Sequence, residues 1–348
     1  MNKLKLNTLL LLKSNSYIIS YSIYSLIGLY CCKYYGLLRG KGLKTPLGLI
    51  SLRLFFFSLA WIPTFFISKL CSFIWLFYLP FYCDLSEYNG WRISRKFRNS
   101  IAAHIFQYIF KCRLVPTSKI ESQCIMAVHP HGIIPFASIT NLASDVTGFA
   151  SLYPTLADKR VVIAATSCFL VPGYRDLLVS SGVLDCSRFN AEYYLQKGWT
   201  VIVLPGGARE ALYSNPDVDW LDLRRKLGFI RLAMKYGVKL VPCYSFNEVD
   251  YISQIPLPSV PSILQSFRNL FQQTFGISFP FLYHIELPPN SENGIVTVVG
   301  EPINVPHIID PTDDEVREVL NKYTNELVKL YQTYAPMYNS RPRKLVIS

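Results

Sequence analysis

Residues 124–132 read Cys124-Ile-Met-Ala-Val-His129-Pro-His131-Gly132, an apolar run that ends in a polar turn. The apolar part has the length and composition of a buried strand. A residue before proline stays extended, and residues two apart on an extended chain project to the same side. The sequence therefore predicts a strand that presents His129 and His131 together, with Gly132 allowing close approach of a ligand.

The same alternation of strand and turn continues toward the C-terminus. We expect strands at 124–128, 160–166, 199–204, 239–245 and 295–299, and helices near 136–146, 174–181, 224–236 and 312–334. Strands separated by helices are typical of βαβ units, so we predict an α/β domain whose largely parallel sheet is flanked by helices. Ligands gather at the carboxyl ends of such strands, which is where the two histidines would lie.

A second strand-to-turn boundary reads Leu204-Pro-Gly206-Gly207-Ala-Arg-Glu210. Consecutive glycines after a strand can present backbone N–H groups to an anion or a developing oxyanion. The segment lacks the Lys and Ser or Thr of a phosphate-binding loop, so nucleotide hydrolysis is not predicted. Glu210 would share a sheet edge with the histidines, where a carboxylate can support acid–base chemistry. The alternative is an ordinary turn with a solvated Glu210 and two structural histidines.

A basic segment, Arg224-Arg225-Lys226-Leu-Gly-Phe-Ile-Arg231, opens the helix expected to end near Gly237. Glycine is common just after a helix. Clustered arginines suit a phosphorylated cosubstrate such as coenzyme A. The alternative is a solvated basic helix face.

Charge is distributed unevenly along the 348 residues, of which 51% are apolar and 17% charged. Residues 1–115 hold 15 Lys and Arg against Asp84 and Glu87, whereas the rest hold 20 against 21 acidic residues, so the net charge of +12 belongs to the N-terminal third. Basic residues that flank apolar stretches are typical of membrane segments. A nucleic-acid binder would carry them on its folded domain. We therefore predict contact with a lipid bilayer and none with nucleic acid.

The N-terminal third divides into two parts. Residues 1–45 are basic and contain the apolar run Tyr17–Cys32, either an interfacial helix or an additional anchor. Residues 46–83 form two apolar legs around Lys69, each about 22 Å long if helical, against a hydrocarbon core of about 30 Å. They predict a membrane hairpin, either spanning or re-entrant, and residues 84–348 then form the catalytic domain.

The nine cysteines are scattered and follow no metal-ligand spacing. We predict no metal site and a reducing compartment. A metal bound by His129 and His131 is disfavoured as well, because no nearby Cys, Asp or Glu completes a ligand set.

Together these motifs resemble the diacylglycerol acyltransferase type 2 family in order and spacing over roughly residues 50–336. The segments that carry the resemblance are His129–Gly132, Arg175–Gly182 with Ser187-Arg188, Leu204–Leu212, Arg225–Pro242, Val298–Ile303 and the Pro311-Thr312 helix. The resemblance implies an enzyme of the endoplasmic reticulum membrane, anchored by a hydrophobic hairpin, that moves an acyl group from acyl-CoA to an acylglycerol such as diacylglycerol. It implies no cofactor beyond acyl-CoA as cosubstrate, both termini in the cytoplasm, and lipid droplets as a second location.

The resemblance and the chemistry assign roles to individual residues. We assign His131 as general base, Glu210 as the group that orients its imidazole, and His129 as an assisting residue. Gly206, Gly207 and Gly132 form the oxyanion site and its turn, and Arg188, Arg224 and Arg225 bind acyl-CoA.

Two departures from the expected patterns stand out. The related glycerolphosphate acyltransferases carry His-x4-Asp, but Phe136 stands five residues after His131. The family also reads Ser-Phe-Gly-Glu-Asn where this chain reads Ser245-Phe-Asn247-Glu248, so a Gly-Glu pair is interpreted as missing and the local loop as altered.

Other functions remain open at this stage. The acceptor is diacylglycerol or, alternatively, monoacylglycerol, a wax alcohol or a sterol. A membrane-anchored lipid-binding protein without catalysis is the alternative from a different class, and the sequence leaves homo-oligomerisation open.

Overall fold

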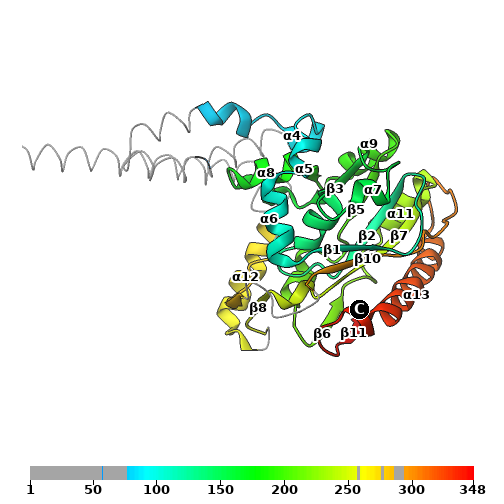
Figure 1. Cartoon of the computed structure of the whole chain (residues 1–348). Coiled ribbons are helices and arrows are strands. Elements are labelled where there is room, and N and C mark those ends of the chain that lie inside the picture. Colours follow the sequence, from blue (N-terminus) through cyan, green and yellow to red (C-terminus); the bar gives the residue numbers. More distant parts are fainter. Residues whose placement is uncertain (1–56, 58–76, 257–258, 276–277, 286–293) are drawn as a thin grey trace, which may run out of the picture. The chain divides into compact units, whose positions relative to one another are not determined.

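The computed structural model describes residues 57, 77–256, 259–275, 278–285 and 294–348, and the chain divides into two compact units (Figure 1). The 1–45 segment and nearly all of the expected 46–83 hairpin lie outside the described residues. Within the described ranges, no helix combines the length and the apolar content needed to cross a membrane.

The described part of the first unit consists mainly of residues 77–85 and 167–176, with the 3₁₀-helix η4 (Thr166–Leu170) at the boundary between the units. The buried Tyr82 hydroxyl donates a hydrogen bond to the Leu170 carbonyl oxygen. The Arg175 guanidinium, fully buried, pairs with the Asp84 carboxylate. These contacts join two segments of the unit that lie far apart in the sequence.

The second unit contains a seven-stranded sheet (Figure 1). In spatial order its strands are β1 (Arg113–Pro116), β10 (Val296–Val299), β7 (Lys239–Phe246), β2 (Cys124–His129), β5 (Thr200–Val203), β3 (Arg160–Ala164) and β4 (Val183–Asp185). The five strands from β7 to β4 run parallel, and β1 and β10 run antiparallel to them. The predicted α/β domain with a largely parallel sheet is confirmed.

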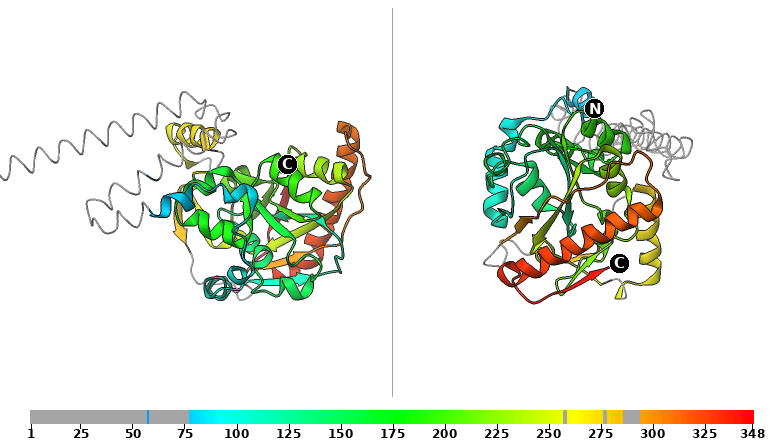
Figure 2. Two further views of the ribbon diagram at one scale, coloured as in Figure 1. Left: turned by 90° about the horizontal axis from the view of Figure 1, so that it is seen from above. Right: turned by 90° about the vertical axis from the view of Figure 1, so that its right-hand side faces the viewer.

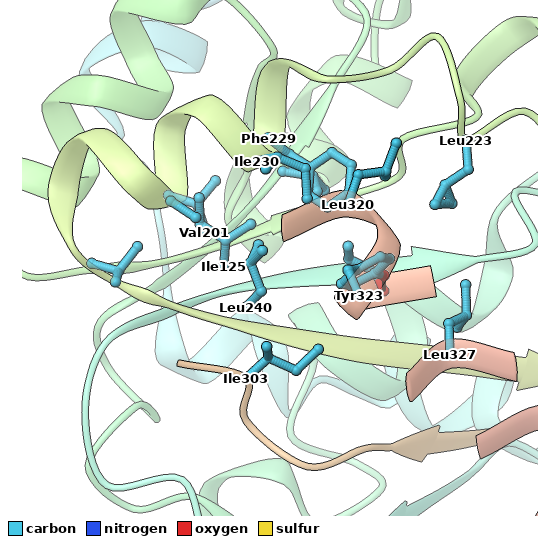
Figure 3. Close-up of a cluster of buried hydrophobic side chains, with 14 of the residues drawn as sticks. Ile125, Val201, Leu223, Phe229, Ile230, Leu240, Ile303, Leu320, Tyr323 and Leu327 are labelled. Carbon is cyan, nitrogen blue, oxygen red and sulfur yellow. Dashed lines mark hydrogen bonds between the residues drawn. The ribbon is translucent and has the colours of Figure 1, made fainter. Parts of the chain in front are cut away.

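One sheet face is covered by α9 (Arg188–Gln196), α11 (Gly228–Tyr236) and α13 (Asp313–Tyr338), which crosses the strands (Figure 2). Their apolar sides join the strands in the main core, where Tyr323 of α13 lies among aliphatic side chains (Figure 3). Helix α13 begins where the sequence favours it, because Thr312 and Glu315 form a reciprocal cap.

The remaining secondary elements of the described residues lie outside the seven-stranded sheet and the three helices just named. They include α4 (Ser86–Asn89), α5 (Arg95–Arg98), α6 (Ile101–Phe110), α7 (Phe149–Leu152), α8 (Tyr174–Ser181), α10 (Gly207–Leu212), α12 (Ser262–Phe275), η5 (Glu248–Asp250) and the antiparallel pair β8 (Ile252–Gln254) and β9 (Leu282–Ile285). The helix expected near 136–146 is a six-residue π-helix, η3 (Ser138–Ala143).

The C-terminal segment forms a separate two-stranded sheet. Strand β11 (Lys344–Ile347) pairs in parallel with β6 (Val218–Leu221). The Ser348 carbonyl oxygen then accepts hydrogen bonds from the backbone amides of Leu223 and Arg224, at 3.0 and 2.9 Å. The buried Arg343 guanidinium pairs with Asp219 at 3.2 Å. The last described residues therefore hold the chain that leads from β6 toward α11.

Candidate active site

His131 lies just beyond the carboxyl end of β2 and is half-buried. Its Nδ1 lies 2.8 Å from the Gly132 carbonyl oxygen. Because a carbonyl only accepts hydrogen bonds, Nδ1 carries the proton and Nε2 keeps a free lone pair. Burial lowers the pKa of His131, while the Gly132 carbonyl raises it by a smaller amount. The side chain is thus a neutral imidazole at neutral pH, with Nε2 able to accept a proton.

His129 has a different environment, although it is only two residues away. Its peptide bond to Pro130 is cis, and its imidazole is fully buried. Nε2 lies 3.1 Å from the hydroxyl oxygen of Tyr323, which itself donates to the Ala127 carbonyl oxygen at 3.3 Å. Burial lowers the pKa of His129 to about 3. The expectation that both imidazoles share one side is therefore wrong, since His129 packs in the core beside α13.

Glu210, in the first turn of α10, is buried. Its two carboxylate oxygens accept hydrogen bonds from the backbone amides of His131, at 2.7 Å, and Asp222, at 3.1 Å. Burial raises its pKa to about 8, and these two amides act in the opposite direction. The expected contact between Glu210 and the His131 imidazole is replaced by a contact with the His131 backbone. The Gly132 carbonyl orients the ring instead.

The three glycines of the predicted oxyanion site each have a local structural reason. A Cβ on Gly206 would lie 2.2 Å from the Glu210 carboxyl carbon, so only glycine leaves room for that carboxylate. Gly207 and Gly132 adopt left-handed backbone conformations, with φ of 55° and 64°. The turn is thus shaped around Glu210, and the Gly206 and Gly207 amides lie at the start of α10.

A second buried carboxylate holds the far end of the same loop. Glu248 accepts a hydrogen bond from the Ala137 amide at 3.0 Å, and burial raises its pKa to about 8. Asn247 has φ of 65°, a conformation that asparagine tolerates and glycine favours. At the position where a Gly-Glu pair is interpreted as missing, the chain has Asn247 in a conformation that glycine favours, followed by the buried Glu248.

A groove of about 500 Å³ adjoins this turn. Its lining includes Pro205, which directly precedes Gly206, Val203 two residues before it, and residues of β3, α9 and α11. Four cationic side chains contribute, from Arg188, Lys226, Arg231 and Lys235. Arg188 and Lys235 both pair with Glu192, and Arg231 pairs with Asp313. Within the described chain, Lys226 forms no ion pair.

Of the three arginines predicted to bind acyl-CoA, one lines this groove. Arg188 lines the groove, but Arg224 and Arg225 are exposed and do not. Helix α11 begins at Gly228, not Arg224, because the Leu223 and Arg224 amides bond to the Ser348 carbonyl oxygen. Sequence reasoning included Lys226 and Arg231 in the basic segment without assigning them, and Tyr323 and Asp222 carried no recognisable signal.

The sequence pattern of the family described as diacylglycerol acyltransferase matches residues 60–348. This chain therefore belongs to that family and is an acyltransferase.

Three characterised relatives are each 32% identical to the chain. They are diacylglycerol O-acyltransferase 2B of Umbelopsis ramanniana, over 76% of this chain and 78% of that protein; human 2-acylglycerol O-acyltransferase 3, over 74% and 79%; and mouse acyl-CoA wax alcohol acyltransferase 2, over 78% and 84%. The crystal structure of the 1-acyl-sn-glycerophosphate acyltransferase PlsC from Thermotoga maritima matches 68% of this chain and 78% of that chain, with 13% identity and a TM-score of 0.36. Such a structural likeness supports no conclusion on function.

Proposed function

We propose that this acyltransferase transfers an acyl group from acyl-CoA to the free hydroxyl of diacylglycerol, with His131 as general base. The observation that carries the proposal is the His131 side chain. The Gly132 carbonyl holds its proton on Nδ1, so Nε2 is left to accept a proton from the acceptor alcohol. A positioned base of this kind contributes roughly 10²–10⁴-fold to a rate.

The reaction needs no cofactor besides the acyl-CoA cosubstrate. As His131 Nε2 takes the hydroxyl proton, the alcohol oxygen attacks the thioester carbonyl and forms the new C–O bond. The Gly206 and Gly207 amides are the proposed donors to the oxyanion. The C–S bond then breaks, and the departing thiolate takes the proton back from His131. Glu210 and His129 position the turn: Glu210 holds the His131 backbone, and His129 anchors the end of β2.

The groove is the proposed site of the coenzyme A moiety. It begins at Pro205, beside the proposed oxyanion donors, and carries Arg188, Lys226, Arg231 and Lys235. Phosphate groups suit such cations. Replacing Lys226 by Gln should raise the KM for acyl-CoA several-fold with a smaller change in kcat, and Arg225→Gln outside the groove is the matched control. An equal change in both variants would place coenzyme A elsewhere.

Diacylglycerol is the proposed acceptor because several relatives are named for it, among them those of Umbelopsis ramanniana and Dictyostelium discoideum. Relatives named for 2-acylglycerol and wax alcohol have similar identity, so an acceptor panel is the deciding experiment. Membranes containing the protein are given labelled acyl-CoA with diacylglycerol, monoacylglycerol, a long-chain alcohol or a sterol. We expect triacylglycerol as the main product. A different main product would reassign the acceptor, and no product with any acceptor would favour a lipid-binding role.

We also propose that residues 46–83 anchor the protein in the endoplasmic reticulum membrane, with both termini in the cytoplasm and lipid droplets as a second location. Diacylglycerol and the acyl chain of acyl-CoA are hydrophobic. Basic residues flank the two apolar legs of residues 46–83 on either side. The protein should stay in the membrane pellet after salt and carbonate washes. Release by salt alone would show that the basic residues bind the surface without insertion. Protease protection of the C-terminus in sealed microsomes would overturn the topology.

A further inference from the structure

Helix α12 is exposed along most of its length, and its exposed residues include large apolar side chains while the one buried residue among those described is a cation. Ile263 and Phe267, one turn apart, are 78% and 50% exposed. Arg268 is only 3% exposed and is the one buried residue among positions 262–272. Helices at an aqueous surface bury their apolar side and expose their cations. The outward side of α12 therefore suits lipid better than water.

Strand β9 has the same property. All four of its residues are exposed, including Leu282 and Ile285. Exposed apolar side chains on two different elements are typical of surfaces that contact another apolar phase.

Arg268 lines a cavity of about 820 Å³, together with Gln265 and Asn269 of α12, Gln254 of β8, and the Tyr213 and Tyr283 side chains. This volume lies in the range of sites for small organic ligands. Its lining combines amides, hydroxyls and the Arg268 guanidinium, which are donors for an oxyanion, with Arg341 and Asp217, which pair with each other at 3.7 Å.

The Arg268 guanidinium has no counter-charge within the described residues. Its Nε is buried without a hydrogen-bond partner. The largest influence on the pKa of Arg268 is burial, which lowers it. Buried cations in proteins are normally paired, and buried hydrogen-bond donors are normally satisfied. By contrast, Arg341 at the same cavity pairs with Asp250 at 3.0 Å.

We propose that the cavity beneath α12 binds the phosphate headgroup of an acidic phospholipid, with Arg268 as the cation that receives the phosphate. A guanidinium matches phosphate by paired N–H···O bonds. The apolar residues of α12 and β9 supply the lipid side of the site. None of these residues takes part in the proposed acyl transfer.

The test uses the full chain purified in a neutral detergent, and it needs no acyl donor. Binding of radiolabelled phosphatidic acid in mixed micelles is compared for the wild type, Arg268→Gln, Arg268→Lys and Arg317→Gln, an exposed position on α13 that serves as the matched control. We expect saturable binding by the wild type and Arg317→Gln. Affinity should fall at least about tenfold in Arg268→Gln and by less in Arg268→Lys, which keeps the charge but loses the paired geometry.

Thermal unfolding provides a second readout. Phosphatidic acid should raise the melting temperature of the wild type but not of Arg268→Gln. Phosphatidylcholine should leave the melting temperature of both proteins unchanged. A different outcome is that inorganic phosphate raises the melting temperature as much as phosphatidic acid does, and only when Arg268 is present. That result would support a phosphate site but would overturn the phospholipid as the ligand. Equal binding by the wild type and both Arg268 variants, or no saturable binding, would overturn the proposal.

Discussion

The two histidines of one four-residue motif lie in two different regions of the protein. His129 lies in the closed core with its imidazole against Tyr323, whereas His131 lies at the open edge with Nε2 available. Burial lowers the pKa of both, yet His131 is partly exposed whereas His129 is fully buried. The proposed general base is therefore distinguished from its neighbour by exposure and not by the direction of its pKa shift. Four predictions test this division, beginning with the largest effect.

We expect acyl transfer to depend on His131. His131→Ala should lower kcat by at least about 100-fold, because the acceptor hydroxyl loses its base, while the melting temperature changes little. Turnover and thermal unfolding are measured on the same preparation, with the exposed His104→Ala on α6 as the control. Wild-type turnover in a normally folded His131→Ala protein would end this assignment.

We expect His129 to contribute to the stability of the fold. His129→Ala leaves a cavity in the core and removes the partner of the Tyr323 hydroxyl, so the free energy of unfolding should fall by about 3 kcal/mol. The expected loss is larger than that of His131→Ala in the same thermal scans. A larger loss of unfolding free energy in His131→Ala than in His129→Ala would contradict these assigned roles.

The protonation of Glu210 makes the free energy of unfolding depend on pH. Its pKa of about 8 exceeds its ordinary value of 4.5, so between these pH values the folded chain holds a proton that the unfolded chain has lost. Stability from this group therefore falls as pH rises toward 8, by up to about 1.4 kcal/mol per unit. In the window from pH 6.5 to 8, His129 and His131 have lowered pKa values in the folded chain, so near pH 6.5 they add a slope of the opposite sign, which the wild type and Glu210→Gln share. Melting curves in this window should be flatter for Glu210→Gln, and an unchanged slope would contradict a buried Glu210.

Glu248 allows the same experiment at a second buried carboxyl group, because its pKa is also raised to about 8 and it holds the other end of the loop. Glu248→Gln should flatten the same window by a similar amount.

The smallest effect concerns the contact between His129 and α13. Tyr323→Phe removes only the hydroxyl, so the free energy of unfolding should fall by about 1 kcal/mol with kcat nearly unchanged. Tyr334→Phe on the same helix is the control. A loss of kcat as large as that of His131→Ala would mean that the buried histidine takes part in catalysis.

Much of the fold could be predicted because it depends on local rules. Apolar runs ending in Pro or Gly placed β2 and β5 and both turns, and Pro311-Thr312 placed the start of α13. Side-chain partners are not local. Nothing in the spacing of Glu210 and His131 distinguishes a bond to the imidazole from a bond to the backbone amide.

Two further misses have identifiable physical causes. The basic run suggested a helix from Arg224, but the first amides of that run are bonded to Ser348, far along the chain. No helix is predicted from the sequence over 262–275, and the sequence does not state which side of α12 faces inward, because that depends on whether water or lipid lies outside.

The pairing of β11 with β6 has a consequence for the order of events during biosynthesis. Ser348 bonds to Leu221 across 127 positions of sequence, and the same residue holds the Leu223 amide next to Asp222, whose own amide bonds to Glu210. A ribosome therefore releases β2, β5 and the His131 turn well before it delivers the strand that fixes their neighbouring segment. The chain between β6 and α11 can therefore reach its final hydrogen bonding only after residues 344–348 have been synthesised.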